Sequence, residues 1–200
     1  MKTIICISRQ FASGGLEIGK ILAERLDIPL YDSEIIDECV VKTGMNKELV
    51  HSHDEKASAS LLYSIAMGYL GNHYIEAPGD AVFRAQAEAI RGFAEKGACI
   101  IVGRCAGEVL RDIPDCKRIF VYADGDFRQN RATTQYGCEQ GKVKKILRDK
   151  DRERASYYTR YADYPWDSIQ SFDLAINTAC CGIEGAVSVI SAFVECCEKG

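Results

Sequence analysis

The sequence predicts an α/β protein in which one parallel sheet of five strands is covered by helices on both faces. Short apolar segments rich in β-branched residues alternate five times with longer segments that show helical periodicity. Such apolar segments are typical of strands that are buried on both faces, as parallel strands are. The 200 residues fit one domain, and an apolar fraction of 47% is enough for a substantial core.

The amino-terminal part of the chain predicts two strands and several helices. The strands are expected at 4–8 and 29–31, and the helices at 14–26, from residue 34 to Gly44, and after Asn46. Asp32 or Ser33 can cap the second helix, and Asn46 can cap the third. The polar residues 51–60 are typical of a flexible link, which is followed by a helix at 61–70 and a loop at 71–79.

The rest of the chain predicts three more strands, at 99–102, 117–122 and 172–176. Helices are expected at 81–96, after Arg104, at 126–136, within the highly charged residues 139–162, and at 184–197. Trp166 is expected to anchor the segment that leads into the last strand.

Polar residues follow each predicted strand where the carboxyl ends of parallel strands meet. They are Ser8-Arg9, Asp32-Ser33, Gly103-Arg104, Ala123-Asp124 and Asn177-Thr178. Ligands of open parallel sheets bind beyond the carboxyl ends of the strands, so the sequence predicts a binding site at this edge.

The first of these connections, residues 8–17, is rich in small residues and opens a helix. Backbone N–H groups at a helix start bind oxyanions, so this segment predicts a phosphate-binding loop. The usual pattern G-x-x-x-x-G-K-S/T is not kept, because Arg9 stands at the first glycine, Gly15 at the lysine and Leu16 at the Ser/Thr. An ordinary strand-to-helix turn that uses glycine for tight geometry stays an alternative.

Arginines gather in three parts of the chain. They are Arg9, Arg104 and a late group made of Arg128, Arg131, Arg148, Arg152, Arg154 and Arg160. Guanidinium binds phosphate bidentately and stays charged, which suits phosphoryl transfer. For residues 142–160, a solvated helix with charge pairs along its surface is the alternative.

The composition excludes several other functions. A net charge of −4 argues against general nucleic-acid binding. The ten cysteines form no C-x-x-C pair and have no zinc spacing, so we expect reduced thiols, a cytoplasmic protein and no metal site made by the protein. No sequence run approaches 18 apolar residues, so no membrane span is expected. No catalytic or metal role is expected for His51, His53 and His73.

Taken together, several motifs resemble the cytidylate kinase-like family over nearly the whole chain. They are Ile7-Ser8-Arg9-Gln10-Phe11-Ala12-Ser13-Gly14-Gly15, Pro29-Leu30-Tyr31-Asp32, Ile101-Val102-Gly103-Arg104, Asp151-Arg152-x-Arg154-x-x-Tyr157-Tyr158 and Phe172-Asp173-Leu174-x-Ile176-Asn177-Thr178. The resemblance implies a three-layer P-loop NTPase fold with a single kinase-like domain over 1–200. Its core would be 1–38, 81–138 and 165–200, its helical, monophosphate-binding insertion 39–80, and its arginine-rich lid 139–164.

The resemblance also implies roles for individual residues, with ATP as the donor, Mg²⁺ as its metal and a small-molecule nucleotide as the partner. The catalytic residues would be Arg9, Arg131, Asp151 and Arg154. The donor phosphates would bind Ser13, Gly14, Gly15, Leu16 and Glu17, and the acceptor would bind Asp32, Ser33 and Arg104.

Departures from the family's pattern leave three functions open. Gly15 stands at the lysine position, Glu17 where a Thr would aid Mg²⁺ binding, and Asp37-Glu38 where the enzymes present Tyr and Arg to the acceptor. Arg9 supplying the missing cation is a hypothesis. The alternatives are an ATP-dependent phosphotransferase, a nucleotide-binding pseudokinase or sensor without turnover, and a fold kept for binding a partner. The oligomeric state also stays open, with a homodimer among the alternatives.

Overall fold

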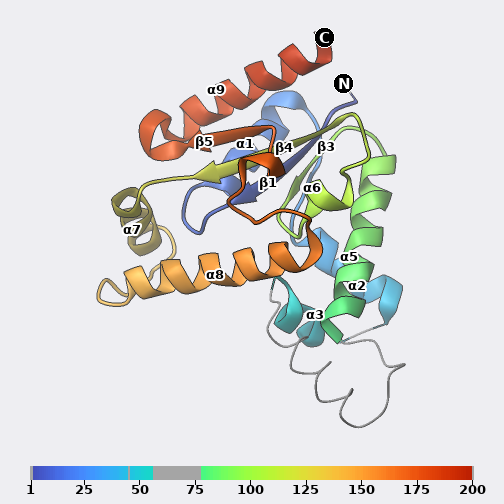
Figure 1. Cartoon of the computed structure of the whole chain (residues 1–200), viewed down its shortest axis with the longest axis horizontal. Helices are drawn as coiled ribbons and strands as arrows, with labels where there is room; N and C mark the ends of the chain where they lie inside the picture. Colours follow the sequence, from blue (N-terminus) through green and yellow to red (C-terminus); the bar gives the residue numbers. More distant parts are fainter. Residues whose placement is uncertain (1, 45, 56–77, 200) are drawn as a thin grey trace.

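A parallel sheet of five strands runs through the centre of the computed structural model, which describes residues 2–44, 46–55 and 78–199 (Figure 1). The strand order is β2-β3-β1-β4-β5. The strands are β1 (Ile4–Arg9), β2 (Leu30–Tyr31), β3 (Cys99–Val102), β4 (Cys116–Tyr122) and β5 (Leu174–Asn177). The five-stranded parallel sheet that the sequence predicts is therefore confirmed.

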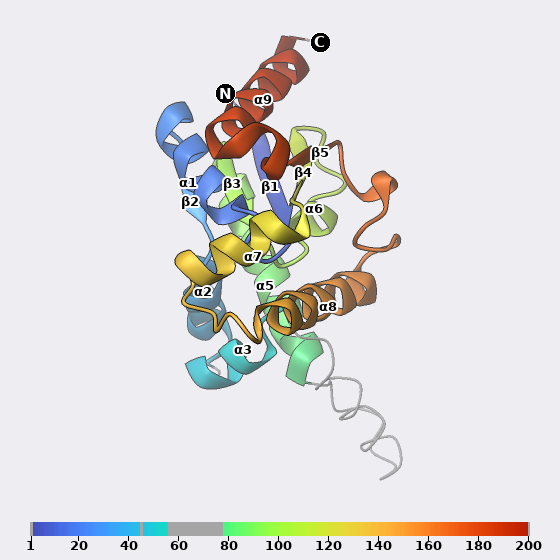
Figure 2. The same ribbon diagram turned by 90° about the vertical axis from the view of Figure 1, so that its left-hand side faces the viewer.

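Helices cover both faces of this sheet. They are α1 (Gly15–Leu26), α2 (Glu34–Thr43), α3 (Lys47–His53), α5 (Pro78–Glu95), α6 (Ala106–Val109), α7 (Gly125–Thr134), α8 (Val143–Tyr161) and α9 (Thr178–Lys199), with the 3-10 turn η1 (Ile169–Ser171) before β5. Seen from the side, α3 and α8 lie close together at the end of the molecule opposite the two termini (Figures 1 and 2).

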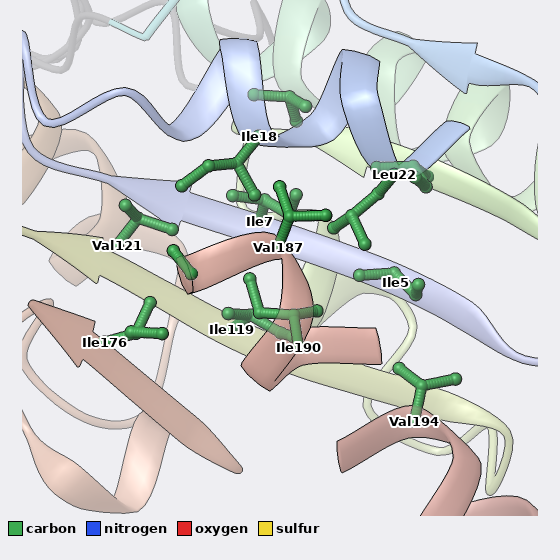
Figure 3. Packing of buried hydrophobic residues seen from close by; sticks show 13 residues of the cluster. Ile5, Ile7, Ile18, Leu22, Ile119, Val121, Ile176, Val187, Ile190 and Val194 are labelled. Carbon is green, nitrogen blue, oxygen red and sulfur yellow. The ribbon is translucent and has the colours of Figure 1, made fainter. Parts of the chain in front are cut away.

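The alternation of side chains along β1 divides the core into two layers. Ile5 and Ile7 point to α1 and α9, where they pack in one apolar cluster (Figure 3). Ile4 and Cys6 point to the opposite face, where α5 and α6 cover them. Since both faces of the strand are buried, its sequence is continuously apolar, which is the pattern that identifies it.

Several predicted boundaries move by a few residues. Helix α5 begins at Pro78, within the predicted loop, because proline fits the first turn of a helix, where its missing N–H is not needed. Helix α3 continues to His53, and α9 begins at Thr178 with a break at Gly182, whose φ of 68° is left-handed. The predicted helix at 61–70 lies outside the described residues, as does His73. The division into core, insertion and lid stays a prediction.

The predicted caps have different outcomes. The Asn46 side chain accepts a hydrogen bond from the amide of Glu48 at 2.7 Å, which confirms it as a cap. Ser33 occupies the cap position of α2, but its side chain makes no capping hydrogen bond. Trp166 is an anchor as predicted, since it is buried, donates to Ser8 Oγ at 2.8 Å and packs edge-on against Phe120.

Helix α9 bears on the expectation from the sequence that the chain contains no membrane span. It has 22 residues, and its most apolar window has a mean hydropathy of 1.6, so by length and composition it is a candidate membrane span. In the sequence this segment did not look like a long apolar run, because Gly, Ser and Glu interrupt it. One stripe of the helix, Ala186, Val187, Ile190 and Val194, packs in the sheet core. Only 22% of the apolar window is buried, so α9 covers the sheet with this stripe and leaves most of that window outside the core.

We expect Ile190→Ala in α9 to lower the free energy of unfolding by about 2–5 kcal/mol, because the side chain is fully buried and its removal leaves a cavity. Val189→Ala, on the exposed side of the same helix, should change it by less than about 0.5 kcal/mol. Urea denaturation measures both values, and equal losses would contradict this account of how α9 packs.

Candidate active site

The loop between β1 and α1 presents free amides at the start of a helix of 12 residues. Gly14 adopts a left-handed φ of 95°. Among the residues that the structure describes, the amides of Gly14, Gly15, Leu16 and Glu17 donate to no acceptor. A row of unpaired N–H groups at a helix start is the arrangement that binds phosphate oxygens.

Ser13 holds this loop in place from the inside. Its side chain is fully buried, and its hydroxyl lies 2.9 Å from the carbonyl oxygen of Gln10 and 3.0 Å from that of Val121. The hydroxyl of Thr178 donates to the Ser13 carbonyl at 2.7 Å. The Ser13 side chain therefore ties the loop to β4, while its carbonyl ties the loop to α9.

The two glycines of the loop leave no room for side chains. A Cβ on Gly14 would overlap Ile183, and a Cβ on Gly15 would lie 2.6 Å from Arg9 Cβ. The stem of Arg9 thus fills the space beside the position that holds a lysine in the usual pattern.

The guanidinium beside the loop is that of Arg131, from α7. This side chain is buried, and its Nη2 pairs with Glu17 Oε2 at 2.5 Å. The same nitrogen lies 3.6 Å from the position that a Cβ would take on Gly14. Arg131 Nε is buried and has no hydrogen-bond partner among the described residues, so it is a donor without an acceptor.

Helix α8 is fastened to the other side of the same loop. Asp151 Oδ1 accepts a hydrogen bond from the amide of Phe11 at 2.7 Å, and its Oδ2 pairs with Arg128 of α7. Arg154 Nη1 donates to the carbonyl of Arg9 at 3.1 Å. Asp151 and Arg154, which the sequence selects as catalytic candidates, therefore both touch the phosphate-loop segment.

A second cluster of charges lies beyond the carboxyl end of β3, around the almost fully buried Arg104. Asp54 binds this guanidinium through both carboxylate oxygens at 2.9 Å, and Asp32 binds it at 3.0 Å. The fully buried Gln86 donates to Asp54 at 2.9 Å and accepts from the Tyr157 hydroxyl at 2.7 Å. Each buried charge thus has a charged or hydrogen-bonded partner.

Glu55 joins this cluster to the loop. Its Oε1 accepts from Arg9 Nη1 at 2.5 Å and from the amide of Arg104 at 3.1 Å, and its Oε2 lies 3.4 Å from Arg154 Nε. A Cβ on Gly103 would overlap both Glu55 and Arg9. The Arg9 guanidinium therefore lies over Gly103 and pairs with Glu55, whereas the sequence-based hypothesis places it at the phosphate loop.

The pKa values of Glu55 and Arg154 are both lowered, for different reasons. Burial opposes the charge of Glu55, but Arg9, Arg154 and Arg104 outweigh burial and hold its pKa far below the usual range. Burial and the neighbouring charge of Arg9 lower the pKa of Arg154 to about 10, against the opposing effect of Glu55 and Asp151.

Burial also works against the charge of Arg104. The carboxylates of Asp54, Glu55 and Asp32 more than compensate, so the pKa of Arg104 is raised above its ordinary value. The pKa values of Glu55, Arg104 and Arg154 all leave these three groups ionised at neutral pH.

The structure thus brings most sequence-selected residues into two adjoining groups. Ser13, Gly14, Gly15, Leu16, Glu17 and Arg131 form the loop group, whereas Arg9, Asp32, Arg104, Asp151 and Arg154 lie beside or beyond it. For Ser33, no side-chain contact is among the described interactions. Sequence reasoning missed Asp54, Glu55 and Gln86, and it placed Arg128 only in the general group of late arginines. The consecutive acids 54 and 55 were a signal, but they stand in a segment that looked like a link.

The residues fit the groups that such a site would hold. The row of free amides and the close-packed glycines suit a polyphosphate, which is anionic and must approach the backbone closely. Mg²⁺ is commonly held by one or two carboxylates together with the substrate's own phosphates. Glu17 is the carboxylate beside the loop, and it is shared with Arg131.

Known proteins that are similar to this chain in sequence or in fold include several kinases. A sequence model described as the cytidylate kinase-like family matches residues 4–179. A cytidylate kinase of Archaeoglobus fulgidus is 24% identical over 96% of this chain and 94% of its own. An uncharacterized protein from Eubacterium ventriosum has a TM-score of 0.72 at 25% identity, covering 96% of this chain and 98% of that one. A shikimate kinase from Bacteroides thetaiotaomicron, with a TM-score of 0.56 and 15% identity over 96% and 98% of the two chains, shares the fold.

We expect Gly15→Ala to lower the free energy of unfolding by about 1–3 kcal/mol, because its Cβ would be forced against Arg9 Cβ. Gly141→Ala is the matched control, since no atom lies within 4 Å of its Cβ position. Thermal unfolding of both variants decides the matter, and an unchanged Tm for Gly15→Ala would show that Arg9 does not occupy this space.

The lowered pKa of Glu55 makes its contribution to stability depend on pH. A carboxylate with a depressed folded-state pKa stabilises fully above its ordinary pKa of about 4.5, and this stabilisation is lost as the pH falls below that value. The difference in unfolding free energy between the unmodified protein and Glu55→Gln should therefore be constant from about pH 6 to 8 and shrink below about pH 4.5. Denaturant titrations across this range measure it, and a difference that grows on acidification would refute the assignment.

Proposed function

Because the chain belongs to the cytidylate kinase-like family, we propose that it transfers the γ-phosphoryl group of ATP to a nucleoside monophosphate or a related small phosphorylated acceptor. The family and the P-loop kinase fold identify a phosphotransferase at the coarse level. The donor, the acceptor and the roles of individual residues are our proposal.

The observation that carries the proposal is the row of four free amides beside Arg131. In the proposed reaction an acceptor oxygen attacks the γ-phosphorus and the bond to the β–γ bridging oxygen breaks, releasing ADP. The amides of residues 14–17 bind donor phosphates, and the Arg131 guanidinium, which carries a buried and unpaired Nε, stabilises charge that develops on the transferred group. Bound Mg²⁺ would neutralise phosphate charge.

Helix α8 supplies the remaining positive charge. Arg154 extends from it to the carbonyl of Arg9 and to Glu55, between the loop and the second cluster. Asp151 fixes the helix to the loop and to Arg128. Since the side chain of Arg154 is only 18% exposed, little water reaches it, and its charge acts more strongly than it would in solvent.

A second candidate function is nucleotide binding without turnover. It is favoured by Gly15 at the lysine position and by the Arg9 stem that closes the space beside it. Removal of one preorganised charge typically costs on the order of 10²–10³ in rate, so loss of the lysine alone can leave binding without useful catalysis.

Two measurements on the purified protein separate the candidates. The kinase proposal predicts transfer from ATP to at least one member of a panel of nucleoside monophosphates, together with a higher Tm in excess ATP and Mg²⁺. A higher Tm without any transfer favours the sensor. A fold kept only for partner binding predicts neither response.

Arg154→Lys tests the residue-level proposal. Lysine keeps a positive charge but loses the planar, bidentate head, so we expect kcat to fall by about 10²–10³. Arg152→Lys is the matched control on the same helix, because Arg152 is 69% exposed and pairs only with Asp149 in the described contacts, and its kcat should stay unchanged. Equal kcat values for the two variants would show that Arg154 takes no part in the reaction.

A further inference from the structure

The carboxylate of Glu55 occupies a place that is built for an anion. Two guanidiniums, from Arg9 and Arg154, and one backbone amide, from Arg104, converge on its two oxygens. Its side chain is only 15% exposed, and no other carboxylate among the described contacts reaches Arg9. The three donors come from β1, from α8 and from the segment after β3, whereas Glu55 is the second residue after α3.

The cluster is neutralised by the chain's own residues. Three guanidiniums, those of Arg9, Arg104 and Arg154, face three carboxylates, those of Asp32, Asp54 and Glu55. A further anion entering this neutral cluster would lose its hydration without gaining a free positive charge. An anionic ligand can therefore bind these arginines well only if one of the carboxylates leaves.

Glu55, rather than Asp54, is the carboxylate that can leave. Asp54 is held by both oxygens on Arg104 and by Gln86, which is itself bonded to Tyr157. Within residues 2–44, 46–55 and 78–199, no such inner network holds Glu55, and its φ of 53° is a left-handed conformation that is unfavourable for a glutamate. Departure of Glu55 relieves that backbone conformation and exposes Arg9 and Arg154 together.

We propose that Glu55 is an internal occupant of an oxyanion subsite made by Arg9, Arg154 and the Arg104 amide, and that a ligand oxyanion binds there by displacing it. The identification of this ligand as the phosphate-acceptor substrate rests on the proposed function. The existence of the subsite does not depend on the proposed function. Glu55 thereby sets specificity, since only an anion that binds the two guanidiniums better than a tethered carboxylate can enter. A phosphate monoester or a carboxylate has this chemistry.

The test is the affinity for inorganic phosphate in the absence of any nucleotide. Glu55→Gln keeps the shape of the side chain but removes its charge, so phosphate should bind at least ten times more tightly than to the unmodified protein in calorimetry. Glu48→Gln is the matched control, because Glu48 is exposed on α3, the helix that precedes Glu55, and the phosphate affinity of this variant should equal that of the unmodified protein. Equal phosphate affinity in Glu55→Gln and the unmodified protein would overturn the proposal.

Removal of Glu55 also leaves buried arginines unpaired, so the variant is expected to be less stable. Phosphate should then raise the Tm of Glu55→Gln much more than that of Glu48→Gln, because a ligand that binds only the folded state stabilises it. A comparison of the Tm shifts caused by phosphate and by acetate distinguishes a phosphate ligand from a carboxylate ligand. A larger shift with one of them identifies the ligand class, and no shift with either counts against the subsite.

A second measurement uses the unmodified protein and does not depend on the variant's folding. The amide of Arg104 donates to Glu55 Oε1, so its NMR resonance should move when saturating phosphate displaces the carboxylate. An unmoved Arg104 amide under saturating phosphate would overturn displacement. Neither measurement involves turnover. Failure of phosphoryl transfer therefore leaves this inference standing, and its own failure leaves the kinase proposal intact.

Discussion

The pairing of buried arginines with carboxylates is the constraint on which this structure depends. Charges taken out of water are tolerated only when partners compensate them, and here the partners come from segments far apart in the sequence. Arg104 after β3 requires Asp32 after β2 and Asp54 after α3, while Arg154 on α8 reaches the carbonyl of Arg9 at the end of β1. Correct pairing of these groups thus fixes α3 and α8 at the carboxyl edge of the sheet (Figure 2).

The fold was predictable from the sequence, whereas the site at the carboxyl edge of the sheet was predictable only in part. Continuous apolar strands such as β3 and glycine-terminated helices are local signals, and they identified the sheet and its order of elements. Arg9 and Arg104 were visible because they adjoin predicted strands, and Arg131 was visible through the late arginine group and the family resemblance. The direction in which each guanidinium points was not predictable from the sequence. It depends on partners far away in the chain, such as Glu55 for Arg9 and Glu17 for Arg131, and no local sequence pattern reveals these pairs.

Residues that have no periodic pattern carried the least information. Asp54 and Glu55 stand among small polar residues, so they looked like part of a flexible link. Their side chains are nevertheless mostly covered, because Asp54 pairs with Arg104 after β3 and Glu55 pairs with Arg154 of α8. Helix α9 shows the opposite case. Glycine and serine interrupt its sequence, yet one continuous apolar stripe packs on the sheet, because helical spacing places those small residues away from the core.

The close contact between Gly15 and the stem of Arg9 also limits how such loops can evolve. A lysine at position 15 and an arginine at position 9 compete for one volume, so each excludes the other. A change from one loop type to the other therefore requires two substitutions. If the arginine is lost first, the intermediate has neither cation, and if the lysine is gained first, the intermediate is overcrowded.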